Sequence, residues 1–72
     1  RKVRNERDKF FTKIKQLEGD IVLWENNIGF FAKSASAETM IREVQEKIEN
    51  AKKMIKTLEE KVRMIDQSGL DE

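Results

Sequence analysis

The chain lacks cysteine, histidine and proline altogether among its 72 residues. Without cysteine there is no disulfide framework or thiolate site, and without histidine the common zinc and transition-metal ligand sets are missing. The longest apolar runs fall far short of the ~20 residues that cross a bilayer. These absences predict a chain with no cofactor, no metal site, no small-molecule substrate and no membrane contact.

Charge is what the chain has in abundance. Charged residues make up 40% of the sequence, yet the net charge is only +1. Such a composition is typical of long solvated helices, and the balance excludes a global attraction to nucleic acid or anionic lipid. The length suits one small domain. Because the sequence begins at Arg1 rather than Met, we expect it to be a piece of a longer protein.

Two apolar stripes with heptad spacing dominate the pattern. The first consists of Val3, Phe10, Ile14, Leu17, Ile21, Trp24, Ile28 and Phe31. The second consists of Ile41, Val44, Ile48, Ala51, Ile55, Leu58, Val62 and Ile65. From Phe10 and from Ile41 onward, steps of four and three residues alternate, and a period of 3.5 is the mark of helices that pack along a narrow seam. The pattern predicts an all-α fold with helices over about 3–31 and 37–66 and a connector over about 32–36.

The helix ends are less sharply marked than the stripes. Residues 26–29 (Asn-Asn-Ile-Gly) favour helix weakly, so an end near Asn27 is an alternative to the preferred end at Phe31. We expect Ser36 to cap the second helix, with Ser34 as the next choice. That helix should end at Ile65 or Asp66, before a glycine at position 69.

A short connector between two helices of equal length predicts an antiparallel coiled-coil hairpin. One register uses the whole seam and pairs Phe31 with Ile41 at the tip and Phe10 with Val62 at the other end. A register shifted by one heptad keeps the same charge pairs nearby, so the charges do not decide between the two registers. The flanking ion pairs predicted for the hairpin are Glu18–Lys52, Asp20–Lys47, Glu6–Lys61 and Arg4–Asp66.

Some apolar residues lie off the seam. Leu23 and Phe30 are seven residues apart and share one outward strip, with Met40 nearby across the connector. Such residues are typical anchors of protein interfaces, although small proteins also leave some apolar surface exposed. We expect Leu23, Phe30 and Met40 to bind either a second copy, making a four-helix bundle, or another protein domain.

The sequence also resembles a known family. The segments WENNIGFFAKS (residues 24–34) and IREVQEKI (residues 41–48), preceded by RDKFF (residues 7–11), are similar to the C-terminal helical hairpin of the bacterial domain-of-unknown-function 349 family. The likeness is to members from Bacteroidetes-type bacteria and covers most of the chain. It implies an all-helical, cytoplasmic, modular protein, and the family has no catalytic residues to carry over.

No arrangement of residues in the sequence indicates catalysis. The acidic clusters at 43–49 and 59–60 alternate with basic residues on solvated helix faces, and the serines lack a histidine base. The rival to a protein-interaction role is nucleic-acid or ribosome binding through a basic segment that consists of Arg1, Lys2, Arg4, Arg7, Lys9 and Lys13. We expect a non-catalytic structural or protein-interaction module, with a homodimer as the leading assembly.

Overall fold

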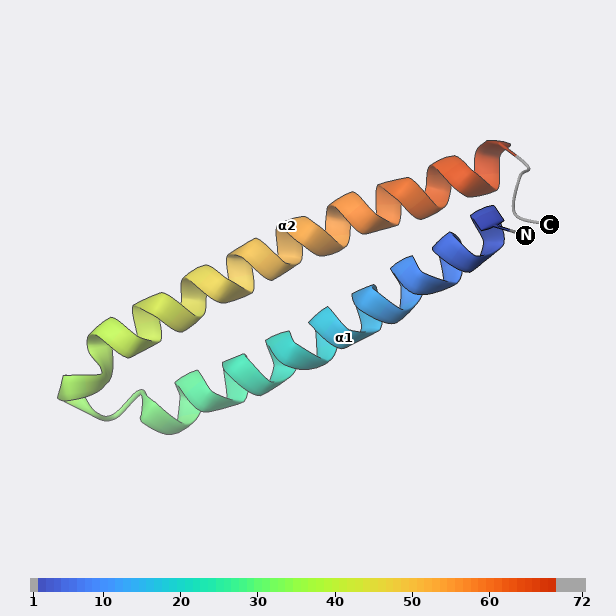
Figure 1. The fold of residues 1–72 in the computed structure, drawn as a ribbon. Helices are drawn as coiled ribbons and strands as arrows, with labels where there is room; N and C mark the ends of the chain where they lie inside the picture. Colours follow the sequence, from blue (N-terminus) through green and yellow to red (C-terminus); the bar gives the residue numbers. More distant parts are fainter. Residues whose placement is uncertain (1, 69–72) are drawn as a thin grey trace.

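The molecule is a hairpin of two long antiparallel helices. The structure, a computed structural model, describes the backbone of residues 2–68 and the side chains of residues 5–68. Helix α1 spans Lys2–Phe31, a short 3-10 turn η1 spans Ala35–Ala37, and α2 spans Glu38–Ser68. Figure 1 shows the helices side by side, with the start of α1 and the end of α2 at the same end of the molecule. The predicted all-α hairpin is confirmed.

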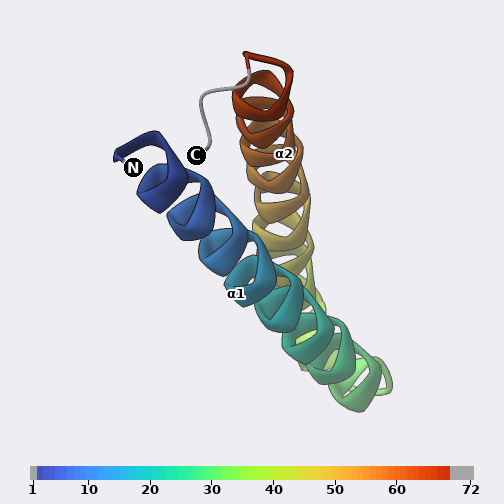
Figure 2. The ribbon, with the colours of Figure 1, turned by 90° about the vertical axis from the view of Figure 1, so that its right-hand side faces the viewer.

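The hairpin is thin and elongated. Its principal extents are 53 × 14 × 13 Å. Turned by 90°, the helices are inclined to one another and meet at the tip (Figure 2). We call the connector end the tip and the opposite end the open end. A body two helices wide has one seam for a core, so each helix leaves most of its circumference to solvent.

Both heptad stripes face this seam. The buried residues that make the core cluster are Ile14, Leu17, Ile21, Ile48, Ala51 and Leu58. Phe10, Trp24, Ile28, Val44 and Ile55 pack against them and are partly buried. Val62 continues the core toward the open end and Ala37 is buried at the tip. The side chain of Val3 lies outside the described residues. Phe31 ends the stripe with 38% of its surface exposed.

Contacts at the open end agree with the register that uses the whole seam. That register pairs Phe10 with Val62, and the Nζ of Lys61, the next residue along, lies 5.7 Å from the centre of the Phe10 ring. One turn further out, Arg7 bonds to Asp66. A shift by one heptad would move these partners about 10 Å apart along the helix axis, at 1.5 Å per residue.

The connector differs from the prediction at the cap of the second helix. The amide of Ser34 donates to the Phe31 carbonyl at 3.0 Å, and the amide of Ala37 donates to the Ser34 carbonyl at 3.2 Å. Ser34, with extended backbone angles, therefore holds the N-cap position of η1, although its side chain makes no capping hydrogen bond. The prediction of Ser36 as the cap is wrong because Ser36 lies inside the 3-10 turn, where its hydroxyl lies 3.0 Å from that of Ser34.

The helix ends are otherwise close to those expected. Helix α1 continues through the Asn-Asn-Ile-Gly segment to Phe31, as preferred. Helix α2 begins at Glu38, one residue later than expected, and runs to Ser68, two residues beyond Asp66. Its last turn is closed by the Ser68 hydroxyl, which donates to the Ile65 carbonyl at 2.7 Å. The predicted stop at position 69 lies outside the described residues.

Candidate interaction surface

The outer side of α1 carries two exposed apolar side chains near the tip. Leu23 is 59% exposed and Phe30 is 81% exposed, the highest fraction of any large apolar residue among the described side chains. The two are separated by two helical turns, so they lie one above the other on the side of α1 turned away from the seam. The predicted outward strip is therefore present on the structure.

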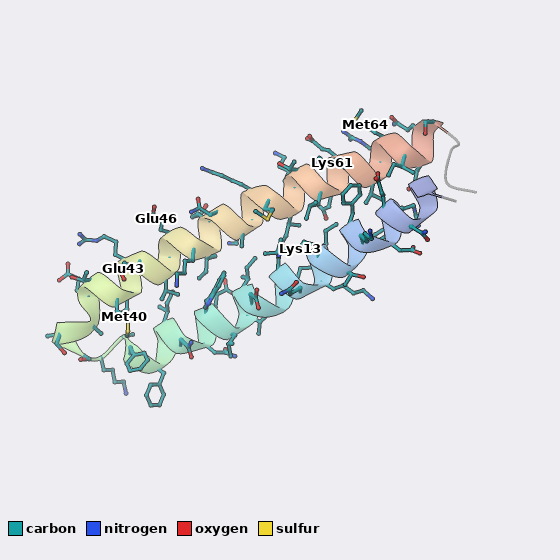
Figure 3. The ribbon with its side chains drawn as sticks, viewed as in Figure 1. Lys13, Met40, Glu43, Glu46, Lys61 and Met64 are labelled. Atoms are coloured by element: carbon teal, nitrogen blue, oxygen red, sulfur yellow. The ribbon has the colours of Figure 1, made fainter. Side chains whose placement is uncertain are left out.

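Phe31 links this strip to the second helix. The rings of Phe30 and Phe31 meet edge to face, with centroids 5.1 Å apart and planes at 82°. Phe31 in turn lines a hollow of about 70 Å³ together with Met40 and Ile41. Figure 3 shows Met40, which is 40% exposed, on α2 beside the connector. We call Leu23, Phe30, Phe31 and Met40 the tip patch.

The sequence pattern missed Phe31 as a member of this patch. Its heptad position assigned it to the seam, and it does lie at the end of the seam, beside Ile28 and Ile41. At the last turn of a helix, however, the partner helix has not fully begun, so one side of the ring stays open. The signal for its membership was the adjacency of the two phenylalanines, because Phe30 faces outward and Phe31 lies next to it at the border of the seam.

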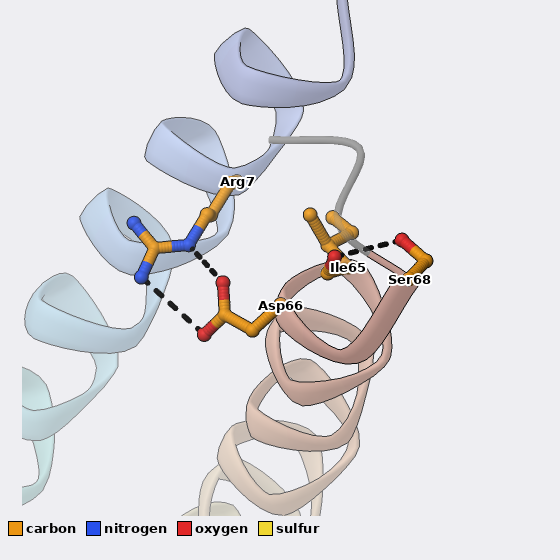
Figure 4. A network of polar contacts seen from close by, with 4 residues as sticks. All are labelled: Arg7, Ile65, Asp66 and Ser68. Carbon is orange, nitrogen blue, oxygen red and sulfur yellow. Dashed lines mark hydrogen bonds and ion pairs between the residues drawn. The ribbon is translucent and has the colours of Figure 1, made fainter. Parts of the chain in front are cut away.

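Three side chains of the predicted basic segment, Arg7, Lys9 and Lys13, are among the described residues. The Nε of Arg7 donates to Asp66 at 2.6 Å and its Nη2 donates to the second carboxylate oxygen at 3.4 Å, as Figure 4 shows. Arg7 is thus turned toward α2. Lys9 and Lys13 are exposed. The side chains at positions 1, 2 and 4 lie outside the described residues.

Cations cover both aromatic rings at the open end. The Arg7 guanidinium lies 4.7 Å from the centroid of Phe11. The Lys61 ammonium lies over Phe10, and Figure 3 shows Lys61 on α2 near the open end. A cation over a ring face is attracted by its quadrupole and shields it from water. One face of each of these two rings is therefore in contact with a cation of the hairpin itself.

None of the predicted ion pairs between described side chains is present. Among the described side chains the structure contains two ion pairs, Arg7–Asp66 and the Glu38–Arg42 pair at 3.2 Å one turn apart on α2. Three predicted pairs do not form: Glu18–Lys52, Asp20–Lys47 and Glu6–Lys61. Long exposed side chains gain too little electrostatic energy from pairing to offset the conformational entropy that they lose. The prediction for Arg4 lies outside the described side chains.

An open groove of about 480 Å³ lies between the helices near the open end. Phe11, Ile14 and Val62 form its apolar part, and charges of both signs, including Lys15 and Glu18, edge it. A second groove of about 460 Å³ follows beside Ile28 and Ile48. Both are shallow channels on one flank of the seam, unlike the enclosed pockets that bind small molecules.

Acidic side chains point into solvent rather than toward each other. Glu43, Glu46 and Glu49 are all exposed, and Figure 3 shows Glu43 and Glu46 on α2. Over the described residues no three side chains of the metal-binding types converge on one point. Neither helix, over its described length, has an apolar stretch long enough to cross a membrane.

Comparison of the chain with protein-family models, with curated proteins and with solved structures finds no match. The resemblance to the domain-of-unknown-function 349 family therefore stays a prediction.

Proposed function

We propose that this chain is a non-catalytic protein-interaction module that binds its partner through the tip patch. The observation that carries the proposal is the exposure of Phe30, 81% of whose surface is open to solvent, next to Leu23 on the same strip. Covering a phenylalanine or leucine side chain yields about 1.5–3 kcal/mol. A partner that covers both residues would gain that free energy without disturbing the seam.

The make-up of the tip patch supports this role. Aromatic side chains are the usual anchors of protein interfaces, and methionine adapts its shape to a partner. Phe30 and Phe31 already hold one another edge to face, so their rings lose little freedom when a partner arrives. The polar neighbours Asn26 and Asn27 can supply the hydrogen bonds that the rim of such an interface needs.

We also propose the wider setting that the resemblance implies, a modular bacterial protein located in the cytoplasm. The segment WENNIGFFAKS (residues 24–34) holds two of the four residues of the tip patch, Phe30 and Phe31, and is the distinctive part of that resemblance. The proposal of a non-enzymatic role rests on the histidine-free and cysteine-free composition and on acidic residues that lie apart on exposed helix faces.

Phosphate binding by the basic segment is the second candidate. Lys9 and Lys13 favour it because both are exposed and lie one turn apart on α1. It is the weaker proposal because Arg7 is bound to Asp66. Gel shifts with RNA and DNA at two salt concentrations test it. A salt-sensitive shift at micromolar protein supports it, and no shift at low salt removes it.

Site-specific photo-crosslinking tests the main proposal. We would place p-benzoylphenylalanine at position 30 in the protein as its cells express it. The matched control places the same group at Met64, which is also exposed, at 66%, but lies near the open end (Figure 3). The proposal expects discrete protein adducts from position 30 and none from position 64. Equal labelling from both positions, or none from position 30, would contradict it.

A further inference from the structure

We infer that the partner of the tip patch is a second copy of this chain, and that two hairpins overlap only at their tips, with the outer faces of their α1 helices packed antiparallel. This inference rests on the proposed function and adds the identity and arrangement of the partner. It differs from a four-helix bundle in which two hairpins lie together along their whole length.

The outer strip of α1 is complementary to itself in the antiparallel sense. When two antiparallel helices place Leu23 of one copy opposite Phe30 of the other, the two-fold axis also places Phe30 opposite Leu23. Between these contacts the same register sets Asn26 opposite Asn27. Side-chain amides can donate and accept, so the two central pairs can bond across the axis. An isologous interface requires this kind of match, in which each residue meets its counterpart twice.

Charge complementarity extends the same register at both ends. Asp20 lies three residues before Leu23, and Lys33 lies three residues after Phe30. Lys33 lies in the connector just beyond the end of α1 at Phe31, so it lies at the end of the register where Asp20 of the other copy lies, and the two-fold axis repeats the pair. Lys33 is exposed and Asp20 is partly exposed, and neither forms an ion pair with a described residue. The net charge of +1 sets little repulsion between copies.

Gly19 lies next to Asp20 at one end of this face, and the proposed register gives it a neighbour. Glycine in a helix interior is destabilising, and a Cβ at position 19 would meet no heavy atom within 4 Å among the described residues. Packing within the hairpin therefore does not require it. In the proposed register Gly19 faces Ser34 of the second copy, where that chain leaves α1 and turns. A missing side chain lets the turn approach the helix closely.

The position of the strip sets the shape of the dimer. The paired part of α1 runs from Asp20 to Phe31, and the start of the connector adds Lys33. At a helical rise of 1.5 Å per residue, the overlap is about 20 Å long. Each hairpin is 53 Å long. Because the two hairpins share only this overlap, the dimer is about 85 Å from end to end. A full-length bundle would keep nearly the length of one hairpin. The short overlap is below the size of a standard interface, so we expect weak association, with Kd on the order of 100 μM.

Sedimentation velocity and small-angle X-ray scattering over a concentration series test the inference. We expect monomers at low micromolar concentration and a dimer of about 85 Å maximum dimension near millimolar concentration, by the rise per residue used above. A monomer throughout the series would overturn the inference. A dimer of about 55 Å would also overturn it, because that length belongs to hairpins aligned side by side.

Substitutions separate the tip contact from general stickiness. Leu23→Ser and Phe30→Ser should each raise the dimer Kd about tenfold or more, since truncated interface anchors usually cost at least that factor. The control Met64→Ser removes a side chain of similar exposure near the open end and should leave Kd unchanged. Gly19→Leu should raise the helical content and thermal stability of the monomer while it weakens the dimer. A purely structural role for position 19 would not move these two quantities in opposite directions.

Cysteine crosslinking fixes the orientation, because the chain has no cysteine of its own. Asn27→Cys places a thiol next to the two-fold axis and should give a disulfide-linked dimer under mild oxidation, while Glu46→Cys on α2 should not. Equal crosslinking at both positions would overturn the arrangement. If the chain stays monomeric while position 30 still crosslinks another protein, this inference fails and the proposed function stands. If position 30 crosslinks nothing, both fail.

Discussion

Each end of the hairpin carries a pair of adjacent phenylalanines, and the surroundings of the two pairs differ. At the open end the rings of Phe10 and Phe11 lie under Lys61 and Arg7, and Phe11 is 37% exposed. At the tip the Phe30 ring touches the edge of Phe31 and is 81% exposed. Neither tip ring lies under a cation from the described residues.

The reason is the length of the neighbouring side chains. Arg7 lies four residues before Phe11 on α1, so its long side chain reaches over the ring. The positions four residues before Phe30 and Phe31 are Asn26 and Asn27, whose side chains are too short to cover a ring. A long side chain on the same helix therefore covers one face of Phe11, whereas no such neighbour covers Phe30, which stays 81% exposed. Composition alone does not distinguish the two pairs, and their neighbours do.

The largest effect expected is a contrast between a seam residue and a tip residue. Ile14→Ala removes a side chain that is 6% exposed, and Phe30→Ala removes one that is 81% exposed. The first should lower the free energy of unfolding by about 2–5 kcal/mol, and the second by less than about 0.5 kcal/mol. Urea denaturation followed by circular dichroism, at low micromolar protein, measures both values.

Low concentration matters for this contrast because it keeps the tip patch uncovered. If Phe30→Ala destabilises the monomer as much as Ile14→Ala, Phe30 contributes to the fold, and its exposure is not a sign of a partner. Because the hairpin is small and marginal, Ile14→Ala can leave it largely unfolded. Leu58→Val, a smaller deletion in the same layer of the seam, then supplies the comparison.

The seam was predictable from the sequence to a large extent. A period of 3.5 residues leaves few ways to bury the two stripes, and one register alone uses every layer from Phe10–Val62 to Phe31–Ile41. The exposed positions of Leu23 and Phe30 followed from the same periodicity, because residues off the seam of a two-helix structure have no third element to cover them. Helical periodicity thus predicted both the core and the strip that the core leaves over.

The contacts of long or flexible groups were not predictable to the same degree. The prediction from the sequence paired Asp66 with Arg4, whereas in the structure Asp66 bonds to Arg7, about one turn further along α1. Ser36 has the usual N-cap chemistry, yet the connector forms a 3-10 turn, and the cap position moves to Ser34. The partner of Asp66 and the position of the N-cap both depend on distances of a few ångströms. The spacing of residues along the sequence predicts only which helical turns lie opposite one another.

Gly29→Ala should strengthen the tip end of α1. A Cβ at this exposed position would meet no heavy atom within 4 Å among the described residues, so the change adds helix propensity without a clash. We expect a gain in the free energy of unfolding of about 0.5–1 kcal/mol. Hydrogen exchange of the amides at 28–31 should slow by a matching factor. An unchanged or faster exchange there would show that the last turn of α1 needs the glycine.

The smallest expected effect is that of the ion pair at the open end. Arg7 bonds to both oxygens of Asp66, but the side chains are 29% and 44% exposed, so solvent screens their attraction. A double-mutant cycle with Arg7→Gln and Asp66→Asn should give a coupling free energy of about 0.5 kcal/mol. The coupling should shrink further in 1 M NaCl, where the screening length is about 3 Å.

The cycle also tests whether Arg7 closes the open end through its ring contact as well as its charge. Arg7→Gln removes both the bond to Asp66 and the guanidinium over Phe11, whereas Asp66→Asn removes only the charge of the acceptor. We therefore expect Arg7→Gln to cost more than Asp66→Asn, and part of its cost to persist in 1 M NaCl. Equal costs that vanish together in salt would mean that Phe11 gains nothing from the cation, and the two phenylalanine pairs would then differ only in burial.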